Sequence, residues 1–248
     1  MEAGEFRRAR KGHSLPGSVA YLMERSKQAS GDWDISPKQA VAIQRELAPK
    51  VIARDDFGEV KLVAGADMSI SGDKKSGYAG VVLFEFPSLR EVERVYAKVP
   101  LKFPYVPGLL SFREIPVLLK AFSKLSKKPD LVFVDGQGIA HPRRLGLASH
   151  LGLLLGLPTI GCAKSRLCGE YLEPGRKRGD SSPLLDKGEK VGVVLRSKDG
   201  VRPLFISVGH RVSLAGAVRW TLACHAGWRI PKPTREADLY VSQVKKNS

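Results

Sequence analysis

Cysteine is scarce in this sequence, with 3 residues among 248, and none of them forms a CxxC pair. Three thiols at these spacings cannot build a disulfide framework, and they match no common zinc or redox motif. We therefore expect incidental or buried thiols in a reducing compartment, and a cytoplasmic location.

Long apolar runs are also missing. The most apolar stretch, LGLASHLGLLLGLPTIGCA, is interrupted by His150 and Pro158 and is rich in glycine. This pattern favours a buried helix followed by a buried strand over a membrane span. The first residues, MEAGEFRRARKGHSLPG, contain no apolar core, so we expect neither a secretion signal nor a membrane partner.

Acidic residues are few relative to basic ones: 41 Lys and Arg residues face 25 Asp and Glu residues, and the formal net charge is +16 at pH 7. Such an excess attracts polyanions, of which nucleic acid is the commonest. Proteins that bind ribosomes or membrane surfaces carry the same kind of excess. Charge alone therefore leaves these classes open.

The chain reads as a basic arm followed by one domain. Residues 1–31 are basic and lack apolar periodicity, so we expect a flexible arm there and a single folded domain over residues 32–248. Helical periodicity begins at Ser36, which can cap the helix, with Pro37 in its first turn. Three strand candidates with short links then predict an antiparallel meander: 60–70, 77–86 and 91–101.

The second half of the chain predicts parallel strands. An apolar strand at 129–136, a helix at 143–156 and a strand at 157–164 form a βαβ unit, which requires parallel strands and a right-handed crossover. We also expect helices at 109–126, 213–226 and 234–246, a hairpin over 189–210 and a basic surface loop at 169–189. The predicted fold class is α/β: a mixed sheet, with an antiparallel meander plus parallel strands, and helices on both faces.

Two carboxylates end strands of this sheet: Asp67 closes VAGAD and Asp135 closes VFVD. If these strands are parallel neighbours, about 5 Å apart, both side chains emerge at one edge and raise one another's pKa. A hard cation such as Mg²⁺ or Mn²⁺ resolves the repulsion. Glu114 is a candidate third carboxylate. Considered one at a time, these residues have simpler interpretations: each Asp starts a turn, and Glu114 is solvated. As a set on a basic protein they indicate a metal-dependent nuclease.

The blocks VAGADMS, FPYVPGLLSFRE, VFVDGQGIAHPRRLGLASHLG, PTIGCAKSRL and SVGH follow one another between the Ser36 helix and Tyr240. In this order they resemble the endonuclease V family, the deoxyinosine-directed repair nucleases with a ribonuclease H-like fold. The resemblance implies a Mg²⁺-dependent DNA repair endonuclease, with Mn²⁺ as a substitute, whose partner is DNA that contains deoxyinosine. It also implies hydrolysis of the second phosphodiester bond 3′ to the deaminated adenine, with 3′-hydroxyl and 5′-phosphate ends. Inosine in RNA is a substrate of some relatives, so DNA and RNA both stay open.

The resemblance also implies the catalytic residues. Asp67 and Asp135 would hold the metal ion, and Glu114 would be the third catalytic carboxylate. Lys164 of GCAKS would approach the phosphate, and His210 of SVGH would complete the site near the metal. The residues alone favour a solvated strand end for Lys164 and the cap of the final helix for His210.

The block FPYVPGLL reads as a DNA-binding wedge. Pro104 and Pro107 fix the backbone around Tyr105 and Val106, and an aromatic ring held outward suits a wedge that enters a base stack. The family uses this block to separate the strands. The alternative is a rigid loop whose Tyr105 packs into the core.

The glycines after Asp135 leave room for a flipped base, and their backbone groups can read the edge of hypoxanthine, which lacks the 2-amino group of guanine. The resemblance adds further residues to this pocket. The predicted base pocket consists of Gly108, Leu110, Gly136, Gly138, His141 and Gly146. Arg143 and Arg144 are expected to contact phosphates, with a solvated helix start as the alternative.

Two other functions stay open. Another ribonuclease H-like nuclease, such as a hybrid nuclease or a junction resolvase, would keep the carboxylates but would not need FPYVPG or the glycine pocket. A non-catalytic nucleic-acid-binding module would show a gap in the set of Asp67, Glu114 and Asp135. A monomer suffices for either nuclease.

Overall fold

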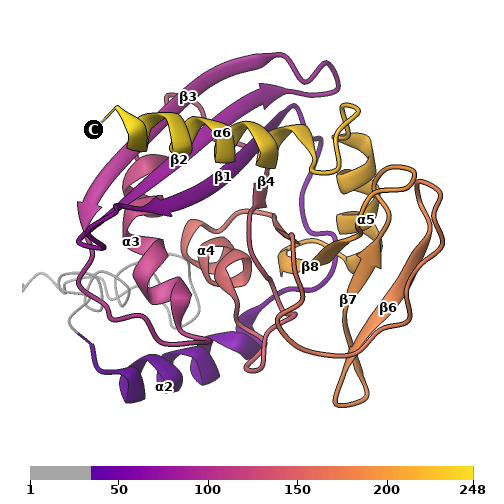
Figure 1. The fold of residues 1–248 in the computed structure, drawn as a ribbon, viewed down its shortest axis with the longest axis horizontal. Coiled ribbons are helices and arrows are strands. Elements are labelled where there is room, and N and C mark those ends of the chain that lie inside the picture. Colours follow the sequence, from indigo (N-terminus) through magenta and orange to yellow (C-terminus); the bar gives the residue numbers. More distant parts are fainter. Residues whose placement is uncertain (1–34, 248) are drawn as a thin grey trace, which may run out of the picture.

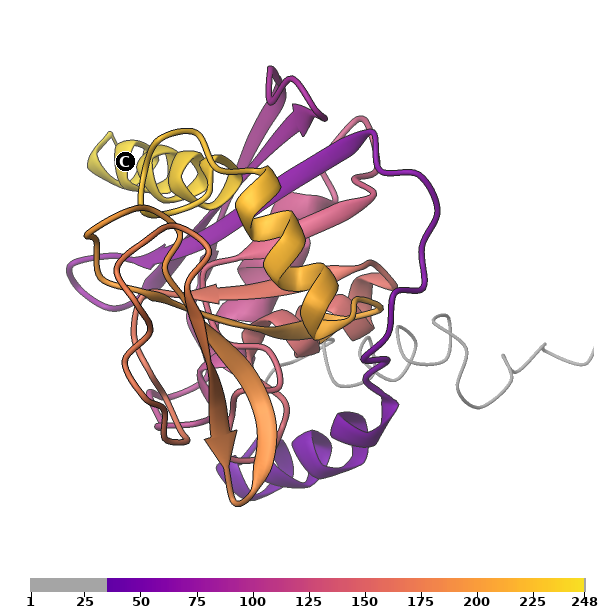
Figure 2. The same ribbon diagram turned by 90° about the vertical axis from the view of Figure 1, so that its right-hand side faces the viewer.

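The computed structural model describes residues 35–247, and the predicted arm 1–31 lies outside the described residues. One eight-stranded sheet runs through the molecule in the order β3-β2-β1-β4-β5-β8-β7-β6 (Figures 1 and 2). It contains both antiparallel and parallel pairs, with helices on both faces. The predicted fold class is therefore confirmed.

The first helix, α2 (Pro37–Leu47), begins where the sequence predicts. The Ser36 hydroxyl accepts a hydrogen bond from the Gln39 amide, and the Gln39 side chain accepts one from the Ser36 amide. This reciprocal cap satisfies two of the free amides at the helix start. A short 3₁₀ turn, η1 (Ala48–Lys50), follows.

The predicted meander is confirmed. Strands β1 (Leu62–Ile70), β2 (Ser76–Glu85) and β3 (Glu91–Pro100) pair in antiparallel order. The chain then enters α3 (Leu110–Phe122), which packs beneath β1 and β2.

The parallel part of the sheet is confirmed as well. Strand β4 (Leu131–Val134) is parallel to β1 on one side and to β5 (Thr159–Ala163) on the other. The crossover between β4 and β5 is α4 (Leu147–Leu155). This helix begins later than the sequence predicts, because residues 136–146 form a loop at the end of β4.

The predicted surface loop at 169–189 is partly wrong. It contains strand β6 (Ser181–Asp186), which pairs with β7 (Glu189–Leu195) at the edge of the sheet. Pro183 obscures this strand in the sequence, and an edge strand tolerates proline because one side makes no ladder hydrogen bonds. The predicted hairpin is confirmed: β7 pairs antiparallel with β8 (Leu204–His210).

Helices cover both faces of the sheet. Helices α3 and α4 pack on one face, against side chains such as Ala66 and Val134. Helix α5 (Leu214–Ala223) covers Phe133 on the other face, and α6 (Lys232–Lys246) lies across β1 and β2 there (Figure 1). No helix in the described range 35–247 has the length and apolar character of a membrane span.

Close packing of α6 on β1 depends on a glycine. A Cβ at Gly65 would lie only 1.8 Å from the carbonyl oxygen of Pro233. The missing side chain lets the start of α6 rest directly on the β1 backbone, two residues before Asp67. This contact sets the position of α6 at the edge of the sheet where β1 and β4 end.

Candidate active site

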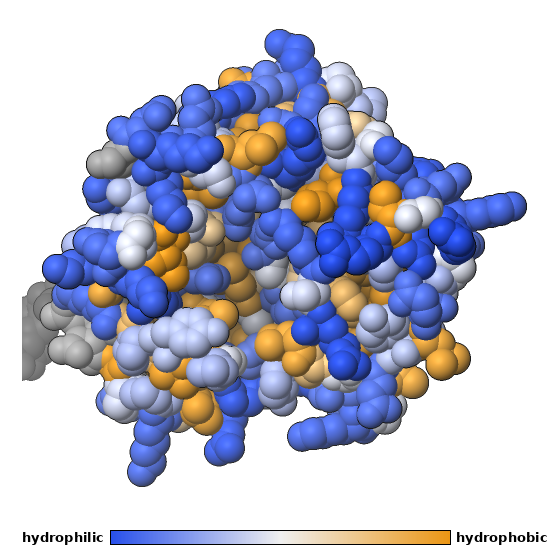
Figure 3. Space-filling model, viewed as in Figure 1, coloured by the Kyte–Doolittle hydropathy of each residue, from blue (hydrophilic) through white to orange (hydrophobic). Residues whose placement is uncertain are grey.

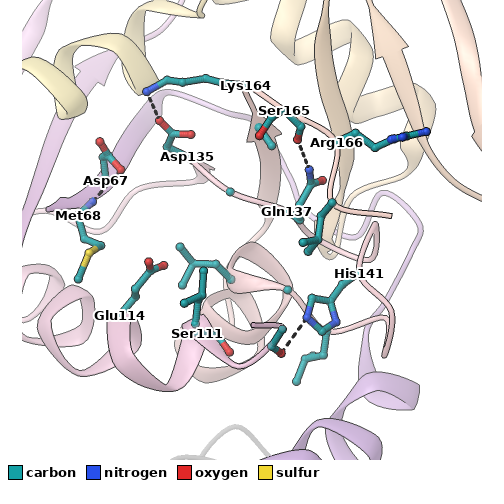
Figure 4. A pocket seen from close by; sticks show the side chains of 18 of the residues that line it. Asp67, Met68, Ser111, Glu114, Asp135, Gln137, His141, Lys164, Ser165 and Arg166 are labelled. Carbon is teal, nitrogen blue, oxygen red and sulfur yellow. Dashed lines mark hydrogen bonds and ion pairs between the residues drawn. The ribbon is translucent and has the colours of Figure 1, made fainter. Parts of the chain in front are cut away.

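The two carboxylates expected at strand ends meet, as the parallel pairing requires. Asp135 does follow the last residue of β4, whereas Asp67 lies within β1, one residue past the end of its ladder with β4. Ala66 lies opposite Val134 in the ladder, and the Asp135 amide donates to the Ala66 carbonyl over 3.1 Å. Ligand oxygens of Asp67, Asp135 and Asp238 all lie within 4.8 Å of one another. The predicted metal pair, Asp67 and Asp135 (Figure 4), is thus joined by a third aspartate, Asp238.

Asp238 was not predicted as a ligand, because it lies in α6 and not at the end of a strand. It follows Ala237, which is buried against β2, and its own side chain is 38% exposed. An aspartate in TREADLYV normally reads as part of a solvated helix face. The one local signal is its place beside the buried positions Ala237 and Val241, and this signal identifies no metal ligand.

Glu114 comes from α3, on the opposite face of the sheet from α6, and lines the same cavity. Burial raises its pKa to about 7, with a further contribution from the charge of Asp135. Burial likewise raises the pKa of Asp67 to about 8, again assisted by Asp135. Burial raises the pKa of Asp135 as well. The raised pKa values show that too little positive charge surrounds these carboxylates to keep them all ionised. Their oxygen atoms are the ligands that a hard divalent cation prefers.

The position of Lys164, directly after β5, brings its ammonium into the group. Its Nζ lies 2.6 Å from Asp135 Oδ2 and 2.8 Å from Asp238 Oδ2. Although burial opposes its charge, the hydrogen bonds to Asp135 and Asp238 raise the pKa of Lys164 above its ordinary value. Lys164 is therefore an ion-pair partner of the carboxylates, and its side chain stays 38% exposed just past the end of β5.

His210 does not reach this edge. Strand β8 runs antiparallel to β5, so His210 at its end lies opposite Thr159, the first residue of β5, while Lys164 follows the last. The Nδ1 atom of His210 accepts a hydrogen bond from the Ile52 amide over 3.2 Å, and burial lowers its pKa to about 4. The expectation that His210 completes the site near the metal is corrected by this geometry. Asp238 occupies that place.

A cavity of about 530 Å³ extends from the carboxylates towards the loop after β4. Figure 3, which shows the molecule from the same side as Figure 1, has a hollow near its middle, with hydrophilic residues around a partly hydrophobic interior. Five of the six predicted pocket residues line the cavity: Gly108, Leu110, Gly136, His141 and Gly146. Ser111, Gln137 and Leu145 also line it and were not predicted.

Gly138 is the exception among the predicted pocket residues. A Cβ there would lie 1.9 Å from the Val208 carbonyl oxygen, and its amide donates to Ser207 Oγ over 2.8 Å. Gly138 therefore lets the loop pack against β8 and does not face the cavity. Its carbonyl accepts from the Gly146 amide, which closes the loop on itself.

The predicted wedge projects from the surface beside this cavity. Tyr105 is 68% exposed, so the alternative of a core-packed ring is wrong. Pro104 and Pro107 are exposed too, whereas Val106 packs partly against the core. The segment is fixed before Tyr105, because Phe103 is buried and its carbonyl accepts from Arg113 over 2.7 Å.

The other end of the wedge is held at the Gly108 carbonyl. Gln44 Nε2 and Arg143 donate to this oxygen over 3.0 and 2.6 Å, and His141 Nε2 lies 3.0 Å from it. The Arg143 amide donates to His141 Nδ1, so Nε2 carries the proton. Burial lowers the pKa of His141 to about 4, which keeps the ring neutral. Gln44 also donates to the Leu145 carbonyl over 3.1 Å and so ties the wedge to the pocket loop.

The two arginines expected at phosphates have protein partners. Arg143 donates to Gln44 Oε1 and to Gly108. Arg144 forms ion pairs of 2.7 Å with Asp186 and 2.8 Å with Glu189 at the β6–β7 turn. These contacts hold the cavity loop to α2 and to the edge hairpin, and phosphate contacts of both arginines stay a prediction.

Replacing Gln44 by Met is expected to lower the free energy of unfolding by about 2 kcal/mol, because the Leu145 carbonyl and Arg143 lose buried partners. Gln44 is fully buried. Chemical denaturation measures the change. The exposed Gln243 provides a control, and Gln243→Met is expected to change stability by less than about 0.5 kcal/mol. Equal effects of the two substitutions would contradict the inference that Gln44 ties the wedge to the pocket loop.

Metal-free stability is expected to fall as the pH rises. The pKa of Asp67 is about 8 and that of Glu114 about 7 in the folded protein, against about 4 in an unfolded chain. The folded state binds more protons between these values, so this contribution is present below about pH 4 and is lost as pH approaches 8. Melting temperatures in EDTA between pH 5 and 8.5 test this slope. Asp67→Asn should flatten it, and an unchanged slope would refute the assignment.

The mixed sheet, covered by helices on both faces, is a ribonuclease H-like fold. Carboxylates meet at one place on it, from β1, α3, the end of β4 and α6, and this arrangement is that of a metal-dependent nuclease. Comparison with known families narrows this class. The family model described as Endonuclease V matches residues 45–239, most of the chain. The chain belongs to the endonuclease V family and is a metal-dependent endonuclease.

Individual relatives agree with this assignment. The chain is 51% identical over 213 residues to an endonuclease V of Azotobacter vinelandii, covering 86% of this chain and 96% of the relative. The crystal structure of endonuclease V from Streptomyces avermitilis superposes with a TM-score of 0.84 at 42% identity, covering 88% of this chain and 96% of that one. A Ciona intestinalis endonuclease V, solved with DNA containing an inosine followed by a ribo-adenosine, superposes with a TM-score of 0.76 at 30% identity, covering 86% and 99%.

Proposed function

We propose that this endonuclease recognises deoxyinosine in DNA and hydrolyses the second phosphodiester bond 3′ to it, leaving 3′-hydroxyl and 5′-phosphate ends. The observation that carries the proposal is that the carboxylate group and the cavity are continuous, with the exposed Tyr105 beside them. A flipped base in the cavity brings its own strand over the carboxylates. The Ciona relative, whose structure holds inosine-containing DNA, supports the same substrate.

The cofactor of the proposed reaction is Mg²⁺, with Mn²⁺ as a substitute. Asp67, Asp135 and Asp238 would hold it, since their oxygens lie within 4.8 Å of one another. When bound, such a cation lowers the pKa of water and stabilises charge on phosphate oxygens. Glu114 faces the group from the opposite helix layer and can orient a water by accepting its hydrogen bond. Lys164 would turn from the aspartates to the phosphate.

Recognition of the base falls to the loop after β4 and the start of α3. Gly136 and Gly146 leave space and present backbone groups, and Leu110 and the neutral His141 complete the wall. Gln137 lines the same cavity, and its Oε1 is buried without a hydrogen-bond partner within the described residues. A buried acceptor of this kind can receive the N1–H of hypoxanthine.

Cleavage of end-labelled oligonucleotides tests the proposal. Matched strands carry inosine, uracil, an abasic site or no lesion, each as DNA and as RNA, with and without Mg²⁺. We expect cleavage of inosine strands one nucleotide beyond the lesion, only with the metal. Cleavage that does not depend on the lesion would favour another ribonuclease H-like nuclease, to be identified on an RNA:DNA hybrid and a DNA junction, and binding without cleavage would favour a non-catalytic module.

Inosine in RNA is a second candidate substrate. The ribo-adenosine that follows the inosine in the Ciona complexes favours it, because a ribonucleotide is accommodated on the 3′ side of the base in that relative. The RNA strands of the same assay measure this activity. The monomeric state and the cytoplasmic location stay predictions.

A further inference from the structure

Trp228, in the loop between α5 and α6, exposes a large aromatic ring to solvent. Its exposed fraction is 54%, and the Arg235 guanidinium lies 4.3 Å from the ring centroid on one side. Arg235 is itself held by an ion pair of 2.6 Å with Glu236. The ring therefore exposes apolar surface to water, and a cation is held beside it.

The loop that presents this ring is fixed on both sides of it. The Gly227 carbonyl accepts from Lys198 Nζ over 2.9 Å, and the Arg229 carbonyl accepts from Ser197 Oγ. The amide of Lys232 donates to the Cys224 carbonyl and closes the loop. A ring held outward in this way loses little conformational entropy when a ligand stacks on it.

The same loop is attached to the catalytic edge. The Arg229 guanidinium donates to the Lys164 carbonyl over 2.9 Å and to the Pro203 carbonyl over 2.8 Å. Arg235 lies one helical turn before Asp238 and therefore on the same face of α6. In Figure 4, α6 stands at the end of the site next to Asp135 and Lys164, with His141 at the other end. Trp228 therefore lies on the metal side, away from the base pocket.

We propose that Trp228 and Arg235 form a subsite that stacks a base on the 3′ side of the cleaved bond. The inference rests on the proposed function, in which the strand runs from the base pocket over the carboxylates. The strand leaving that edge carries phosphates for Arg235 and unpaired bases for the solvent-exposed part of the Trp228 ring. Stacking on an aromatic ring beside an arginine is how proteins bind single strands without reading their sequence.

The subsite is tested by removing the Trp228 ring and a substrate base, first separately and then together. Wild type and Trp228→Ala are compared on an inosine strand, and on strands with a single abasic position at the first or second nucleotide 3′ of the cut. We expect Trp228→Ala to lower kcat/KM roughly 5- to 150-fold on the intact strand, and to have little further effect when the stacked base is missing. Trp228→Tyr should restore most of the activity. Leu172→Ala removes another exposed apolar side chain and should change nothing.

The outcomes separate the subsite from its alternatives. Wild-type activity of Trp228→Ala, or the same loss on the intact strand and on both abasic strands, would overturn the subsite. A lowered melting temperature with equal losses would assign Trp228 to loop stability. Dissociation constants of the same strands give the same comparison from binding alone, independently of cleavage. They therefore distinguish a failed subsite from a failed function, in which the wild type cuts no inosine strand.

Discussion

Alanine at Asp67 or Asp135 is expected to lower the cleavage rate at least about a thousandfold and to leave binding of an inosine oligonucleotide within a few-fold of wild type. The bound cation provides several kcal/mol of transition-state stabilisation, and each 1.4 kcal/mol is a factor of ten in rate. Affinity is expected from the base-pocket part of the cavity, around Gly136 and His141, and from a chain with a net charge of +16, and neither requires these carboxylates. Single-turnover cleavage and equilibrium binding are measured on the same strand.

A matched aspartate controls for general effects of the substitution. Asp199 is exposed in the β7–β8 turn, and its Oδ1 accepts from the Arg178 amide. Asp199→Asn keeps this acceptor and should cleave like wild type. Near-normal turnover of Asp67→Ala or Asp135→Ala with Mg²⁺ would remove the metal site from the mechanism.

Tyr105→Ala is expected to lower cleavage of duplex inosine substrates roughly 5- to 150-fold, which corresponds to a stacking energy of about 1–3 kcal/mol per base. A base in a duplex must be unstacked and unpaired before it reaches the cavity, whereas a single strand is already partly open. The loss on single-stranded inosine should therefore be smaller. Cleavage rates on both substrates measure the difference.

Tyr105→Phe is the matched control, because stacking needs the ring and not the hydroxyl, and it should cleave both substrates almost normally. The ring is 68% exposed, so neither substitution should change the melting temperature by more than a degree or two. Equal losses on duplex and single strand, together with a lowered melting temperature, would mean that Tyr105 supports the fold and does not enter the base stack.

The parts of the site that could be predicted are those that local patterns determine. Asp67 and Asp135 each follow an apolar run of residues, and parallel pairing of those runs suffices to bring the two side chains together. The exposure of Tyr105 follows from two prolines that hold a short segment away from the helix after it. In both cases the chain within a few residues carries the information.

The parts that could not be predicted depend on packing between distant segments. Asp238 reaches the carboxylates only because Gly65 lets α6 rest on β1, and no local pattern links these positions. His210 lies at the opposite edge because β8 runs antiparallel to β5, a direction that the sequence leaves open. Strand β6 has a proline and weak alternation, so only its pairing with β7 defines it.

The ion pairs of Lys164 have a consequence for the stoichiometry of the metal. In the protein without substrate, a bound cation would keep Asp67, Asp135 and Asp238 ionised. With Glu114 protonated below its pKa of about 7 and the Lys164 ammonium among the aspartates, the group would then carry two negative charges, which a single divalent cation would balance. A second divalent ion would leave the group with excess positive charge unless it brought an anion with it. The phosphodiester of the bound strand is such an anion, so occupancy by a second ion would be coupled to the substrate, and the protein alone would bind one.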